Sequence, residues 1–103
     1  MKYQLVLQWP CDANLADLHR LVEIEDTVAG QMPPGSKDDG HDIGSKQMNI
    51  FILTNKPLLC FERIKATLGK EDAWTNIRVA YRERTGDNYA ILWPPYLTEF
   101  GVA

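Results

Sequence analysis

The side chains of this chain that could do chemistry are concentrated in one short polar stretch, residues 40–45, which leads into an apolar run. The apolar run, residues 48–53, has the length and the β-branched or aromatic content of a buried strand. Polar loops held by a rigid strand often carry binding and catalytic groups. The candidate residues of this region are His41, Asp42, Ser45 and, on the strand itself, Asn49.

Glu25 is a second candidate, because it interrupts the apolar stripe of a helix expected over residues 15–29. With steps of about 100° per residue, Leu18, Leu21, Val22 and Ala29 fall on one stripe, with Leu15 and Val28 at its margins. The carboxylate either reaches solvent at the edge of the core or is buried, and then it needs a partner. In the buried case we expect a raised pKa and a partner such as His41 or an arginine.

The buried alternative predicts one polar cluster with Glu25 as acid, base or ligand anchor. Its members are Glu25, His41, Asp42, Ser45 and Asn49.

The third candidate is a set of arginines close to aromatic residues near the end of the chain. Residues 77–84 alternate as a strand does, and residues 85–88, Thr-Gly-Asp-Asn, are typical of a hairpin turn. If residues 86 and 87 form a two-residue loop, Arg82 faces Ile91 and Trp93 shares that face of the sheet. Arg82 and Trp93 would then form a patch able to stack on bases or hold an acidic partner. A slip of one residue would move Trp93 to the opposite face.

The motifs of common catalytic classes are not present. The chain has no Gly-rich phosphate loop, no nucleophile elbow and no zinc-ligand spacing. The pair His41-Asp42 is also typical of a turn in which a carboxylate accepts backbone N–H groups, and the other histidine is the distant His19. We therefore assign no catalytic residue, no metal and no cofactor.

Length and composition indicate one globular domain over residues 1–103, with 45% hydrophobic and 24% charged residues. Residues 1–42 hold eight carboxylates against three bases, and residues 43–103 hold eight bases against six carboxylates, so the two parts carry −5 and +2. The overall charge of −3 argues against a nucleic-acid binder, which needs a concentrated basic face.

The start of the chain alternates apolar and polar residues and lacks the apolar block of a secretory signal. No apolar run approaches the ~18 residues of a membrane span. We therefore expect a cytoplasmic protein without a membrane partner, in which Cys11 and Cys60 stay unpaired as small hydrophobic side chains.

The order of predicted elements gives the fold class. Alternation predicts strands over residues 2–9, 41–45, 47–54 and 77–84, followed by a hairpin strand that ends before Pro94. A second helix begins at Pro57, capped by Thr54 or Asn55, and ends before Gly69. The order is βαββαβ with an extra C-terminal strand, so we expect an α+β, ferredoxin-like sandwich: an antiparallel sheet with two helices on one face.

The second face of this sheet carries too many large apolar groups to stay in water. Self-association through the sheet would cover it, and so would the tail over residues 96–103.

Two stretches, KYQLVLQWP at residues 2–10 and GHDIGSKQMNIFILT at residues 40–54, together with the hairpin from RVAYRE to ILWP, resemble a group of short uncharacterised bacterial proteins of similar length. This resemblance implies no activity, substrate or site. The small size and lack of motifs are also similar to immunity proteins that neutralise toxins in bacterial competition.

We therefore expect a non-enzymatic module that binds a protein partner, with an immunity or inhibitor role as one version. Its contacts would lie on the second sheet face or on residues 40–45. The alternative is a small enzyme or ligand sensor built on Glu25, His41 and Asn49.

Overall fold

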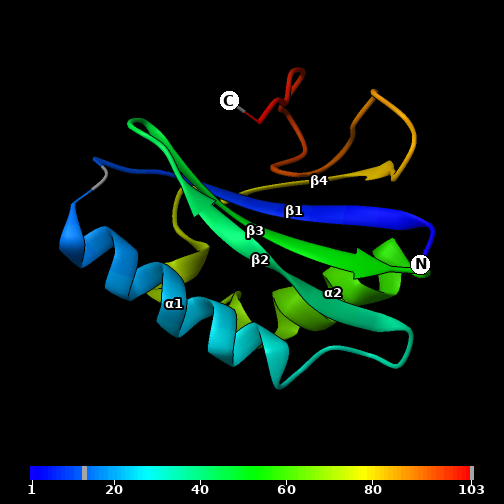
Figure 1. Ribbon diagram of the computed structural model, residues 1–103, viewed down its shortest axis with the longest axis horizontal. Helices are drawn as coiled ribbons and strands as arrows, with labels where there is room; N and C mark the ends of the chain where they lie inside the picture. The colour runs from blue at the N-terminus through cyan, green and yellow to red at the C-terminus, as the bar shows by residue number, and fades with distance from the viewer. Residues whose placement is uncertain (13, 103) are drawn as a thin grey trace.

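The computed structural model describes residues 1–12 and 14–102 and contains five strands and two helices. The elements run β1 (Tyr3–Pro10), α1 (Leu15–Ala29), β2 (Ser36–Ile43), β3 (Gln47–Thr54), α2 (Pro57–Leu68), a 3-10 turn η1 (Asp72–Trp74), β4 (Arg78–Glu83) and β5 (Ala90–Trp93) (Figure 1). The protein is therefore of the α+β class.

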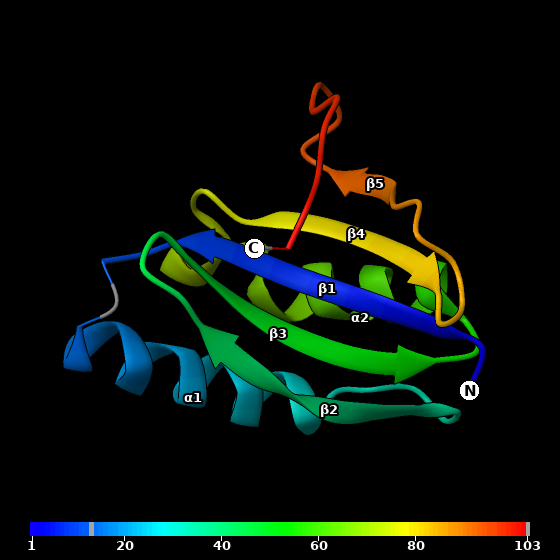
Figure 2. The same ribbon diagram turned by 45° about the horizontal axis from the view of Figure 1, so that its top comes forward.

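All neighbouring strands are antiparallel, in the order β2-β3-β1-β4-β5 (Figure 2). β1 lies at the centre, where Leu5 pairs with Ile52 of β3 and Tyr81 of β4. Five consecutive residues of β1, from Leu5 to Trp9, are buried, so both faces of this strand are covered.

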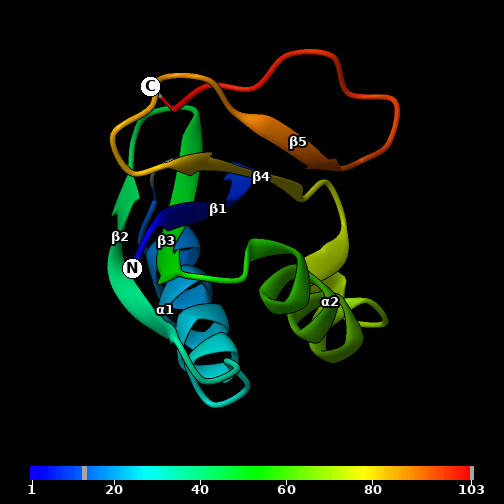
Figure 3. The same ribbon diagram turned by 90° about the vertical axis from the view of Figure 1, so that its right-hand side faces the viewer.

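Both helices lie on one face of the sheet (Figure 3). The expected bounds of α1 are confirmed: the Asn14 side chain accepts a hydrogen bond from the Asp17 N–H, and the helix ends at Gly30. The buried stripe is turned by about one position from the expected one. It consists of Leu21, Ile24, Glu25 and Val28, whereas Val22 is exposed.

The start of α2 also differs from the prediction. Its N-cap is Lys56 and makes no side-chain capping bond, while the Thr54 hydroxyl accepts the Lys56 N–H at 3.0 Å. Pro57 opens the helix as expected. In its first turn Leu58 is exposed, whereas Cys60 is fully buried. Burial raises the pKa of the Cys60 thiol, which keeps it in the un-ionised form of a small hydrophobic side chain.

β2 begins five residues before the predicted strand and ends before Ser45. The Pro, Gly and Asp content of this region is typical of a loop, but an edge strand also tolerates charged residues because one of its edges faces solvent. A bulge between Asp38 and His41 contains Gly40, whose φ of 95° favours glycine. The Gly40 N–H donates to the Asp38 carboxylate at 2.9 Å.

The register of β4 and β5 corrects the predicted hairpin. Residues 84–89 connect the strands instead of a two-residue loop, and the ladder carries a bulge between Val79 and Ala80. Trp93 therefore pairs with Val79, which belongs to the helix-covered core, and not with Ala80. Arg82 and Trp93 consequently lie on opposite faces of the sheet, so the predicted arginine and tryptophan patch does not form.

The C-terminal segment covers the second face of the sheet (Figure 3). Gly101 accepts a hydrogen bond from Gln8 of β1, and the Phe100 ring packs on Tyr89 with ring centroids 4.9 Å apart. Val6 on this face is fully buried. Of the two expected ways to cover this face, the structure therefore shows the tail.

The position of Trp93 can be tested with a double-mutant cycle. Trp74 and Trp93 lie with ring centroids 5.5 Å apart on the helix side. We expect Trp74→Ala and Trp93→Ala to couple by about 0.5–1.5 kcal/mol in urea unfolding followed by circular dichroism, since aromatic pairs are worth this much beyond their burial. The Arg82→Ala and Trp93→Ala pair is the control and should be additive. Stronger coupling in the control pair than in the tryptophan pair would contradict the observed register.

Candidate functional site

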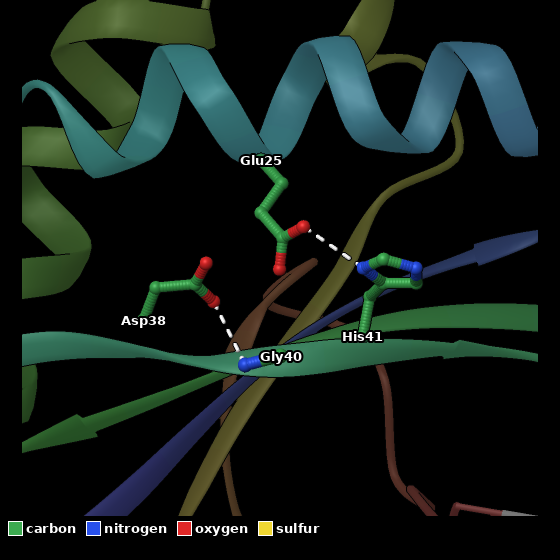
Figure 4. Close-up of polar contacts among 4 residues, drawn as sticks. All are labelled: Glu25, Asp38, Gly40 and His41. Atoms are coloured by element: carbon green, nitrogen blue, oxygen red, sulfur yellow. Dashed lines mark hydrogen bonds and ion pairs between the residues drawn. The ribbon is translucent and has the colours of Figure 1, made fainter.

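Glu25 is buried and lies between α1 and β2, where His41 is its partner (Figure 4). Their contact joins His41 Nδ1 to Glu25 Oε1 at 2.8 Å. His41 reaches the helix because it pairs with the core residue Ile50 and so points to the helix-covered face. Of the two outcomes that the sequence left open for Glu25, the structure shows the buried one, with the expected histidine partner.

The second oxygen of Glu25, Oε2, is buried and accepts no hydrogen bond from any residue between 1 and 12 or 14 and 102. Desolvation raises the pKa of Glu25. The contact with His41 lowers this pKa, and the nearby Asp38 carboxyl raises it further, so the net shift is upward. The site can therefore hold a proton on Glu25 at a pH where an exposed carboxyl has lost it.

The other members of the predicted cluster lie on the opposite side of the sheet. Asp42 follows His41 by one residue and pairs with Asn49, so both face the side covered by the tail. The Asn49 amide donates to the Asp42 carboxylate at 2.8 Å. Glu25 and His41 therefore do not converge with Asn49, and the single cluster expected from the sequence is two separate pairs.

Gln8, which the sequence did not single out, organises the second pair. Its side-chain amide nitrogen lies 3.0 Å from Asn49 Oδ1, 2.9 Å from the Gly101 carbonyl oxygen and 3.1 Å from Gln47 Oε1. Gln8 and Asn49 are both buried. Buried amides must be hydrogen-bonded, so this network holds the tail on β1.

Ser45 is exposed in the turn between β2 and β3. Together with Asp42 and Asn49 it lines a small hollow of about 260 Å³ on that hairpin. Three of the predicted site residues therefore share one concavity, although it is small on the scale of ligand sites.

The Arg82 side chain forms hydrogen bonds to the connection between β4 and β5. Its Nε donates to Gln4, and one terminal nitrogen donates to the carbonyls of Arg84 and Gly86 at 3.0 and 2.9 Å. The guanidinium also lies 5.9 Å from the centroid of the Tyr89 ring. These contacts engage two of the three guanidinium nitrogens of Arg82 within the protein.

A larger cleft lies where β1, β3, β4 and β5 meet at one end of the sheet, beside the tail. Its volume is about 380 Å³. Its aromatic lining consists of Trp9, Trp74, Trp93 and Tyr96. The Trp9 ring is held by a hydrogen bond from its Nε1 to the Ala73 carbonyl at 2.6 Å. Trp93 of the predicted site therefore does line a cleft, but a different one from the expected patch.

The cleft differs in charge from the protein as a whole. Lys46 and Arg78 are its charged lining residues, and no described carboxylate lines it, although the chain carries a net charge of −3. Both side chains are exposed, and neither forms an ion pair within residues 1–12 and 14–102. The sequence contained one signal for this cleft, since Trp9-Pro10 and Trp93-Pro94 each end a strand.

In the described part of the chain, no three or more His, Cys, Asp or Glu side chains are arranged to hold a metal ion. Neither helix described here has the length and apolar character needed to cross a bilayer.

Comparisons with protein-family models, with curated proteins and with solved structures each find no match to this chain.

The raised pKa of Glu25 predicts how stability depends on pH. In an unfolded chain a glutamate titrates near pH 4.3, so below that pH the stability from protonated Glu25 is fully present. It is lost as the pH rises through the higher pKa of the folded state. Glu25→Gln should remove this fall and raise stability at neutral pH by about 1 kcal/mol.

Urea unfolding between pH 4 and 8 measures the effect of Glu25→Gln, with Glu23→Gln as the matched control. Glu23 is an exposed carboxylate on the same helix. A pH profile for Glu25→Gln that runs parallel to that of the unmodified protein would contradict a buried, titrating Glu25.

The Gln8 network predicts the cost of releasing the tail. Gln8→Ala removes the donor shared by Asn49 and Gly101, and a buried group left unpaired costs about 1–3 kcal/mol. Gln4→Ala is the control, because Gln4 is half-buried on the same strand and accepts a hydrogen bond from Arg82. Gln8→Ala should also speed amide exchange over residues 99–102, and unchanged exchange there would contradict the role of Gln8.

Proposed function

We propose that this protein is a small binding module that holds its ligand in the cleft lined by Trp9, Trp74, Trp93 and Tyr96 without acting on it chemically. The observation that carries the proposal is the cleft itself, about 380 Å³ in volume with an aromatic lining. Ligand sites in proteins are mostly apolar clefts of about 300–1,000 Å³ with a few polar groups. The other hollow built from predicted site residues is smaller, at about 260 Å³.

The separation of the polar pairs favours binding over catalysis. An acid or base must come within hydrogen-bond reach of a reacting group. Glu25 is buried between α1 and β2 and does not line the cleft, while Asn49 is buried under the tail. The enzyme or sensor built on Glu25, His41 and Asn49 therefore has less support than a module that binds through the cleft.

A protein partner is the second candidate, and Tyr96 favours it. Its ring lies at the rim of the cleft and is 83% exposed, and exposed tyrosines are enriched where proteins bind each other. In this version the partner inserts a side chain into the cleft, and an immunity or inhibitor role is one case. Self-association through the sheet face has less support, since the tail covers that face.

We also propose that the fold is a ferredoxin-like sandwich with a fifth strand and that the protein acts in the cytoplasm. The neighbours β2-β3-β1-β4, all antiparallel, and the two helices on one face support the fold. The two free cysteines support a reducing compartment.

The proposal predicts that the affinity for ligands depends on Tyr96. A thermal-shift screen of a metabolite library should give hits that bind Tyr96→Ala about 3–10-fold more weakly in calorimetry, because an aromatic contact contributes about 0.5–1.5 kcal/mol. Leu58→Ala is the matched control, since Leu58 is also exposed and apolar but lies on α2 outside the cleft.

Equal binding to both variants would contradict the cleft as the site. A hit whose amide shifts in NMR map to residues 42–49 and not to the cleft would do the same.

A further inference from the structure

We propose that the ligand is a small organic anion in which a carboxylate or a similar group is attached to a flat apolar ring, and that Arg78 and Lys46 bind the anionic group. This inference rests on the proposed function, because it names the ligand class of the same cleft.

The charged side chains that line the cleft favour an anionic ligand. Arg78 and Lys46 are two cations in a cleft without a described carboxylate, on a chain with a net charge of −3. Three of the other four arginines donate hydrogen bonds within the protein: Arg20 to the Asp72 carbonyl, Arg82 to the hairpin carbonyls, and Arg84 to the Met1 carbonyl. The Arg78 and Lys46 side chains form no such bond among the residues that the structure describes.

Arg78 is the better placed of the two cations. It begins β4, next to Gln8 of β1 in the sheet, so its backbone is fixed by the ladder. A guanidinium donates two parallel hydrogen bonds to one carboxylate, which gives both energy and orientation. Lys46 comes from the turn before β3 and supplies a point charge from another wall of the cleft.

The rings of the lining argue for the flat apolar part of the ligand. Trp9 forms part of the lining although only 2% of it is exposed, so it is held rigidly by the core. Tyr96 has the opposite character, with a ring that makes no ring contact within the described chain and is free to lie against a ligand. Aromatic side chains combined with a small number of polar and charged groups are typical of sites for small molecules.

The test uses 2-naphthoate as the anionic probe and 2-naphthamide as the neutral probe of the same shape, with acetate as an anion without a ring. We expect calorimetry to give binding of naphthoate about tenfold tighter than that of naphthamide, since a hydrogen bond to a charged group contributes more than a neutral one. Acetate should not bind measurably, and NMR shifts caused by naphthoate should map to residues 74–78 and 93–97.

Three charge-removing variants test the roles of Arg78 and Lys46. Arg78→Gln should reduce naphthoate binding to the level of naphthamide and leave naphthamide unchanged. Arg84→Gln is the matched control, because Arg84 follows the other end of β4 and does not line the cleft. It should leave both affinities unchanged, while Lys46→Gln should give a smaller loss than Arg78→Gln.

The proposal of an anionic ligand would be overturned by equal affinities for naphthoate and naphthamide. Equal losses of naphthoate affinity in Arg78→Gln and Arg84→Gln would overturn it as well. If neutral library hits still depended on Tyr96 in that case, the cleft would stand as a binding site and only its ligand class would be wrong. Absence of any hit or probe from the cleft would overturn both proposals.

Discussion

The burial of β1 on both of its faces is the constraint on which the rest of the structure depends. A strand at the centre of a sheet has its backbone groups paired on both edges, and here each face is also covered, by the helices on one side and by the tail on the other. The helix side receives Leu5 and Leu7, which need only packing. The tail side receives Val6 and also Gln8, whose buried amide requires partners. The tail is held in place because it supplies one of these partners.

The central elements could be predicted from the sequence because periodicity decides them. The bounds of α1 and β3 match the expected ones, since a long amphipathic period and a long apolar run have few other places in a fold. The extent and register of the two edge strands, β2 and β5, could not be predicted in the same way. β2 carries Lys37, Asp38 and Asp39, a composition that fits a loop as well as an edge strand. The register of β5 depends on a six-residue connection and a bulge, which alternation does not encode.

The candidate site shows a similar division. The position of Glu25 within an apolar stripe could be read from the sequence, because it depends on the periodicity of one helix. Its contact with His41 was expected because a buried carboxylate needs a partner. The split between His41 and Asp42 also follows from a local rule, since neighbours in a strand point to opposite faces. The cleft could not be predicted, because its walls come from four strands, the 3-10 turn η1 and the tail, and these lie together only through the order of strands in the sheet. Only the two Trp-Pro pairs at strand ends pointed to it.

The hydrogen bond between Gln8 and Gly101 joins the first strand to nearly the last residue that the structure describes, 93 positions later. During synthesis the ribosome therefore releases β1, β3 and both helices well before the segment that completes the second face. Until that segment emerges, the nascent sheet exposes Val6 to solvent. A chain interrupted before the tail would keep Val6 exposed and would leave the buried Gln8 amide without its Gly101 partner.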